Sequence, residues 1–128
     1  MKIDIVDELP FITVLMHFRG RQLVLDHVLL DTGSAGTVFA VDQVETIDLL
    51  PEPGDPIRQI RGVGGSEFVF SKRIERLVVG ELEVSDFEIE VGAMKYGFAL
   101  NGIIGLDFLL QTKAMIDLDG LEIYRPGH

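Results

Sequence analysis

One aspartate in this sequence stands where an apolar segment ends and a short polar segment begins. The residues read Leu29-Leu30-Asp31-Thr32-Gly33-Ser34, which places Asp31 at the end of an expected buried strand. Gly33 lets the backbone approach closely and offers an unhindered N–H to the carboxylate. A carboxylate held in this way can act as a general base toward water. The same residue types are common in turns, so this motif alone leaves both interpretations open.

A second segment, Gly62-Val63-Gly64-Gly65, contains more glycine than a tight turn needs. It lies between two expected strands, which is typical of a hairpin tip that closes over a bound extended chain. A loose hairpin end is the alternative. A phosphate-binding loop is excluded because no Gly-Lys-Ser/Thr follows and no helix begins there.

A third segment places two isoleucines between glycines, directly ahead of a short helical pattern. It reads Asn101-Gly102-Ile103-Ile104-Gly105-Leu106-Asp107-Phe108-Leu109. Such a segment suits a strand that packs tightly beneath another backbone, although alone it fits any core strand.

The elements that must position these residues are short, rich in Val, Ile and Phe, and separated by glycine or proline, which is typical of a mostly-β chain. Residues 82–91 alternate apolar and acidic types, which predicts a strand with one buried and one exposed face. Asp119-Gly120 predicts a hairpin turn. Helical spacing occurs only in residues 41–50 and 106–112. We predict a closed β structure with one or two short helices and strands at residues 11–18, 22–30, 57–62, 67–79, 82–91, 114–118 and 121–124.

Length and charge narrow the classes of function. The chain has 128 residues, which predicts a single domain over residues 1–128. Its 21 acidic and 11 basic residues give a net charge of -10, which argues against nucleic acid as a partner. The absence of cysteine excludes disulfides, thiolate metal sites and thiol nucleophiles. Three scattered histidines argue against a metal site, so we expect no metal and no cofactor.

The N-terminal residues give no indication of export. Asp4 and Asp7 interrupt the apolar core that a signal peptide needs. The longest apolar runs are too short to span a bilayer. We therefore expect a cytoplasmic protein with no membrane partner.

Taken together and in this order, the three motifs make the sequence similar to the retropepsin-like aspartic proteases, the single-domain retroviral proteases and their relatives. The resemblance extends from about Phe11 to Tyr124 and implies a closed acid-protease-type β-barrel with a flap hairpin. In that family each of two chains contributes one Asp-Thr-Gly, so the resemblance implies a homodimer in which Asp31 faces Asp31 of a second copy. It implies an aspartic endopeptidase that hydrolyses extended polypeptides with a water molecule activated by aspartate.

The resemblance also assigns supporting roles. Thr32 would hydrogen-bond across the two-fold axis, and Gly33 and Ser34 would surround the carboxylates with donors. Flap residues Gly62, Val63, Gly64 and Gly65 would cover the substrate, with Ile104, and in a weaker assignment Val38, lining side-chain pockets.

Two departures from the retroviral pattern concern the dimer. Retroviral chains carry an Arg–Asp ion pair at the positions of Leu106 and Ala35, and both partners are replaced together here. The C-terminal segment continues into a full hairpin, which resembles the bacterial and cellular members more. A non-catalytic dimeric module that binds peptides in the same groove is therefore the alternative function, since a fold does not fix an activity.

Overall fold

The computed structural model describes residues 1–62, 65–94 and 99–127, without the side chains of residues 60–67. Its strands are β1 (Asp4–Val6), β2 (Leu9–Phe18), β3 (Arg21–Leu30), β4 (Val38–Ala40), β5 (Ile57–Gly62), β6 (Gly65–Val79), β7 (Leu82–Gly92), β8 (Gly102–Ile104), β9 (Met115–Asp117) and β10 (Glu122–Tyr124). Its helices are α1 (Val41–Val44), the 3-10 turn η1 (Glu45–Ile47) and α2 (Leu106–Thr112).

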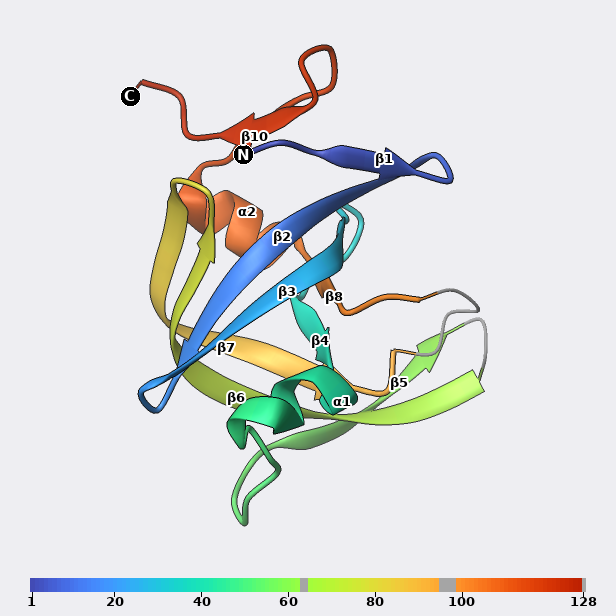
Figure 1. Ribbon diagram of the computed structural model, residues 1–128. Helices are drawn as coiled ribbons and strands as arrows, with labels where there is room; N and C mark the ends of the chain where they lie inside the picture. The colour runs from blue at the N-terminus through green and yellow to red at the C-terminus, as the bar shows by residue number, and fades with distance from the viewer. Residues whose placement is uncertain (63–64, 95–98, 128) are drawn as a thin grey trace.

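Eight of the strands form one sheet in the order β1-β2-β3-β8-β4-β7-β6-β5. Strand β2 also pairs with β6, where Met16 lies opposite Leu77, so the sheet closes on itself. Figure 1 shows the resulting ring, with β6 and β7 curving beneath β2 and β3. The predicted mostly-β, acid-protease-type fold with one or two short helices is confirmed, and the structure has two, α1 and α2.

Three segments that are distant in sequence meet in the middle of this sheet. Strand β8 runs parallel to β3 and antiparallel to β4, and β4 runs parallel to β7. β8 is thus inserted between two strands that precede it by more than sixty residues. This arrangement brings the residues after Leu30, before Val38 and after Ile104 to one place.

The predicted alternation of β7 is confirmed. Its apolar side chains, including Val84, Phe87 and Ile89, are buried, whereas Glu83 and Glu88 are exposed. Asp86, with a left-handed φ of 50°, is exposed next to the exposed Ser85, which interrupts the alternation once while the register with β6 stays unshifted. Glu83, Asp86 and Glu88 therefore lie on a solvated outer face.

Helix α2 closes one end of the ring. Its buried side chains are Phe108, Leu109 and Thr112, and the Phe108 ring meets the Phe87 ring edge-on, with centroids 6.1 Å apart. Beyond it, β9 and β10 form the predicted C-terminal hairpin, in which Ile123 pairs with Ile116. No helix among the described residues has the length and apolar character that crossing a bilayer requires.

Candidate active site

Asp31 is the first residue after β3, and the sheet fixes its backbone. Leu30 lies opposite Ile104 in the parallel β3–β8 pair, and the Asp31 N–H donates to the Ile104 carbonyl at 3.0 Å. The carboxylate is therefore attached to the rigid centre of the sheet rather than to a free loop. Asp31 is half-buried, so part of its surface is open to solvent.

The residues after Asp31 orient its carboxylate. The Gly33 N–H donates to Asp31 Oδ1 at 2.9 Å, and the Ser34 N–H donates to the Asp31 carbonyl at 3.2 Å. A Cβ atom at Gly33 would lie 3.2 Å from the same Oδ1, so glycine allows this close approach. Thr32 is exposed at the tip of the turn, where a second molecule can reach it.

Ser34 connects the loop to the start of α2. Its hydroxyl donates to the Gly36 carbonyl at 2.8 Å, and its own carbonyl accepts the Leu106 N–H at 2.7 Å. The hydroxyl is thus engaged within its own loop, so within one chain only the Gly33 N–H donates to the Asp31 carboxylate, while the Ser34 N–H donates to the Asp31 carbonyl.

Two residues that sequence reasoning did not single out hold this loop from behind. The Thr37 hydroxyl donates to Asp107 Oδ1 at 2.7 Å and accepts the Gly105 N–H at 3.1 Å. The Thr37 N–H donates to the other oxygen of Asp107 at 3.3 Å. Thr37 is buried, although threonine is more often exposed. In the sequence, the only indication of this contact is that Thr37 and Asp107 are polar residues that each adjoin apolar residues.

An ion pair borders the same loop. The Glu90 N–H donates to the Thr37 carbonyl at 2.9 Å, and the Glu90 carboxylate is bound by the guanidinium of Arg58. The hydrogen bond to Glu90 raises the pKa of Arg58 above its ordinary value. The positive charge of Arg58 thereby offsets the charge of a carboxylate that lies beside the Asp31 loop.

The predicted flap is the hairpin of β5 and β6. Its last described pair is Gly62 opposite Gly65, while Val63 and Gly64 lie outside the described residues. Figure 1 shows the hairpin extending from the ring at the side opposite α2.

Ile104 does not line an open surface. Ile104 is 0% exposed and belongs to the main core, so within one chain it has no exposed surface that could meet a substrate. Because successive side chains on a strand point to opposite faces, its neighbour Ile103 lies in a separate, smaller apolar cluster. That cluster also contains Val38 and lies nearer the surface, with both residues slightly exposed.

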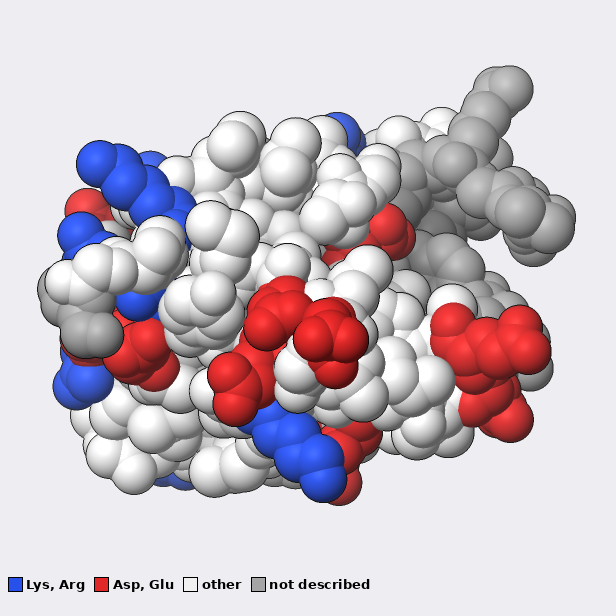
Figure 2. Space-filling view, turned by 90° about the horizontal axis from the view of Figure 1, so that it is seen from above, with Lys and Arg blue, Asp and Glu red and all other residues white. Residues whose placement is uncertain are grey.

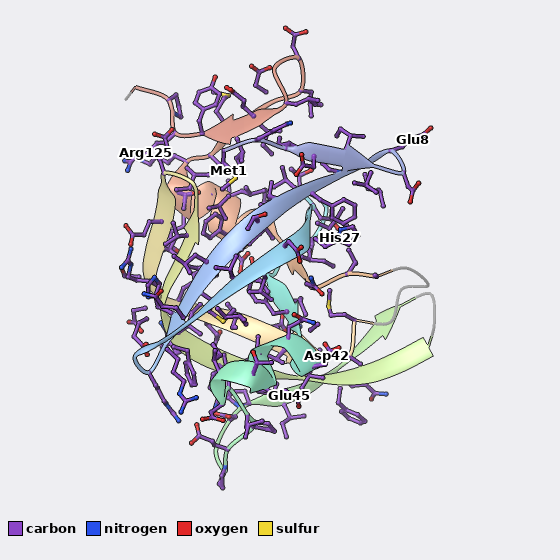
Figure 3. All side chains as sticks on the ribbon, in the orientation of Figure 1. Met1, Glu8, His27, Asp42, Glu45 and Arg125 are labelled. Atoms are coloured by element: carbon purple, nitrogen blue, oxygen red, sulfur yellow. The ribbon has the colours of Figure 1, made fainter. Side chains whose placement is uncertain are left out.

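His27, near the end of β3 that leads to Asp31 (Figure 3), takes no part in the loop contacts described above. Its imidazole ring stacks on Phe11 with centroids 4.1 Å apart, which is a structural contact. Among the described residues, no three histidines or acidic side chains converge closely enough to hold a metal ion.

The arrangement presents one oriented carboxylate that can accept a proton from water. Hydrolysis of an amide also requires a group that polarises the carbonyl and a proton for the departing nitrogen. Within the described residues, no second acidic side chain is hydrogen-bonded to Asp31 or to the N–H groups around it.

Comparison with known proteins identifies the family. No curated protein matches the chain. A family model described as aspartyl protease matches residues 17–108, more than two thirds of the chain. The matched segment includes the Asp31 loop, the β5–β6 hairpin, β8 and the first residues of α2. The chain therefore belongs to the aspartyl protease family.

Proposed function

We propose that the protein is an aspartic endopeptidase that acts as a homodimer, with one Asp31 contributed by each copy. The observation that carries the proposal is the half-buried Asp31, held by the Gly33 N–H at the centre of the sheet. This chain contains one Asp-Thr-Gly. A second copy supplies the second acid that the chemistry needs.

Two carboxylates held a few ångströms apart cannot both ionise easily, so the pair shares one proton. The charged Asp31 removes a proton from the attacking water, while the protonated Asp31 of the second copy donates to the substrate carbonyl. The water oxygen bonds to the carbonyl carbon and gives a tetrahedral diol. Collapse of the diol breaks the C–N bond as the nitrogen receives a proton. This sequence of steps requires no metal and no cofactor.

The supporting roles that the family resemblance implies complete the proposal. Thr32, exposed at the loop tip, contacts the second copy, and Gly33 holds the charged oxygen. The flap, Gly62 to Gly65, covers an extended peptide, with Val63 and Gly64 nearest to it. The cluster that contains Ile103 and Val38 favours apolar substrate side chains beside the cleaved bond. An extended peptide can bind such a site through main-chain hydrogen bonds.

The test is cleavage of a diverse peptide library at mildly acidic pH, followed by mass spectrometry. Asp31→Asn removes the titrating group and keeps the size of the side chain, so we expect cleavage to fall about a thousandfold or more. The melting temperature should change little. Asp42→Asn, at an exposed aspartate of α1 (Figure 3), is the matched control and should cleave like the native chain.

The pH profile adds a second criterion. A shared proton requires a rate that peaks on the acidic side of neutrality and falls as both carboxylates ionise. A rate that still rises above pH 8 contradicts the mechanism. Absence of cleavage by demonstrated dimers would instead favour the peptide-binding module.

A further inference from the structure

Helix α2 carries leucine on both of its sides. Phe108, Leu109 and Thr112 face the core, as expected of the buried stripe of a short helix. The opposite side carries Leu106 and Leu110, which lie one helical turn apart. Their side chains are 38% and 67% exposed. Polar residues are the usual occupants of such a face, so Leu106 and Leu110 together give this side of α2 an apolar character that a partner surface can cover.

This leucine face is continuous with the loop that carries Asp31. The Leu106 N–H donates to the Ser34 carbonyl, and the Asp107 N–H donates to the Ala35 carbonyl at 3.3 Å. Gly105 is packed so closely on the loop that a Cβ there would lie 2.2 Å from the Gly36 carbonyl oxygen. Whatever approaches the exposed side of the Asp31 loop therefore also approaches the first turn of α2.

The terminal segments, by contrast, are already paired within the chain. The Ile3 N–H donates to the Leu121 carbonyl, and the Ile123 N–H donates to the Met1 carbonyl, each at 2.8 Å. The Met1 ammonium donates to the Ile123 carbonyl at 3.1 Å. Ile3 and Ile123 are buried in the main core, so separating these segments would expose both side chains. Figure 3 shows Met1 beside β10.

We propose that two copies of this chain meet through the leucine face of α2, Leu106 and Leu110, while the terminal segments stay paired within their own chain. The proposal rests on the homodimeric function above, because one Asp31 is half of the site. Specific interfaces bury roughly 1,200–2,000 Å² in total, so these leucines form the apolar centre of an area that includes both Asp31 loops.

The distribution of charge also favours the leucine face of α2 as the interface between two copies. Each copy has a net charge of -10, so two copies repel each other wherever acidic faces approach. Figure 2, seen from the side of the terminal hairpin, shows acidic groups at the middle and right of that face, so an approach through those groups would be repulsive. On α2 the only charged side chain is Asp107, and its carboxylate is bound by Thr37. Contact through α2 therefore brings no free carboxylates together.

The test measures dimerisation by analytical ultracentrifugation over a range of protein concentrations. Leu110→Glu should weaken the dimer at least about tenfold and lower cleavage at low protein concentration, with recovery at high concentration. Leu110→Met keeps an apolar side chain and should dimerise like the native chain. Val24→Glu is the matched control, since Val24 is 66% exposed and lies roughly 20 Å along β3 from Asp31. It should leave the dimer unchanged, and circular dichroism checks that each variant is folded.

Two results overturn this proposal in different ways. If the native protein dimerises and cleaves peptides, and Leu110→Glu does the same with unchanged affinity, the interface is elsewhere and the proposed activity stands. If the native protein stays monomeric and cleaves nothing, both the proposed activity and the proposed interface are wrong.

The lack of cysteine allows a direct distance measurement. A spin label on Leu110→Cys or Val24→Cys is the only label in the chain. Labels at position 110 of two copies should lie closer together than labels at position 24. The reverse order would contradict the proposed interface.

Discussion

At the scale of single residues, the Asp31 loop depends on a buried hydroxyl. Thr37 donates to Asp107 and accepts from the Gly105 N–H, so it connects the residues after Asp31 to the start of α2. The Asp107 carboxylate also accepts the Phe108 N–H at 2.8 Å. Removing one member leaves the others unpaired in a buried place, which costs more than the hydrogen bond itself contributes.

Thr37→Val should therefore lower the free energy of unfolding by about 1–3 kcal/mol, because valine fills the same space and leaves the Gly105 N–H without its acceptor. Thr37→Ser keeps the hydroxyl and loses only a methyl group, so it should cost less. Urea unfolding of the two variants makes the comparison. Equal stability of Thr37→Val and the native protein would show that the hydroxyl does not hold the loop.

At the scale of elements, β8 and the turn after it determine where α2 begins. Gly102 lies against Phe39, where a Cβ would come within 2.5 Å of the ring, and Gly105 lies against the Gly36 carbonyl. The backbone of β8 can pass beneath the Asp31 loop only because both positions lack a side chain. The predicted strand packed beneath another backbone is confirmed, and the helix predicted at residues 106–112 is confirmed with the same bounds.

Gly105→Ala should prevent folding or cost at least about 3 kcal/mol, since the new methyl group overlaps the Gly36 carbonyl oxygen, which the Ser34 hydroxyl also binds. Gly54→Ala is the informative control. Gly54 has open space around it but a left-handed φ of 94°, so alanine there should cost only about 1–2 kcal/mol of backbone strain. Thermal unfolding separates the two effects, and similar melting temperatures would contradict the packing argument.

At the scale of the whole molecule, a buried lysine ties the loop that precedes β5 to the ring. Lys72 of β6 is 5% exposed, and its Nζ lies 2.6 Å from both Glu52 Oε1 and Asp55 Oδ2. Burial alone would lower the pKa of Lys72, but the hydrogen bonds to Asp55 and Glu52 outweigh it and raise that pKa. Hydrogen bonds from Arg19 and then Lys72 lower the pKa of Glu52 from 4.5 to about 2. The hydrogen bond from Lys72 also lowers the pKa of Asp55.

These shifts predict how stability depends on pH. A carboxyl whose pKa is lower in the folded state stabilises the fold above its unfolded pKa, and this contribution is lost as pH falls. For Glu52 the loss should occur between about pH 5 and pH 2. The fold should therefore keep this contribution at the mildly acidic pH of the proposed activity.

Lys72→Met removes the ammonium group that binds both Glu52 and Asp55. The free energy of unfolding of this variant should therefore fall less steeply with decreasing pH than that of the native protein. The stability difference from the native protein should shrink as pH falls from 6 to 3, measured by urea unfolding at each pH. Lys113→Met, which removes a positive charge outside this cluster, is the control. Parallel curves for the native protein and Lys72→Met would contradict the assignment.

Local sequence patterns were sufficient to predict the longer strands, helix α2 and the position of Asp31. They were not sufficient to predict the shortest strands or the residues that pack around Asp31. The hairpin of β2 and β3, the alternating β7 and the helix α2 are periodic or bounded by turn residues, so short-range rules identify them. Strands β1 and β4 have three residues each and carry no periodicity. They form because β2 and β8 offer open edges, which no local window contains.

The sequence by itself determined the class of fold, the family and the candidate carboxylate, because the short β-type segments and the order of the three glycine-containing motifs are features of the chain alone. Only the tertiary structure decided that Ile104 is core and Ile103 is nearer the surface, since strand pairing sets which face is inward. The structure alone also brought Thr37 to Asp107, seventy residues away, and left Leu106 and Leu110 exposed. Such contacts depend on how distant segments pack, and adjacent residues do not encode them.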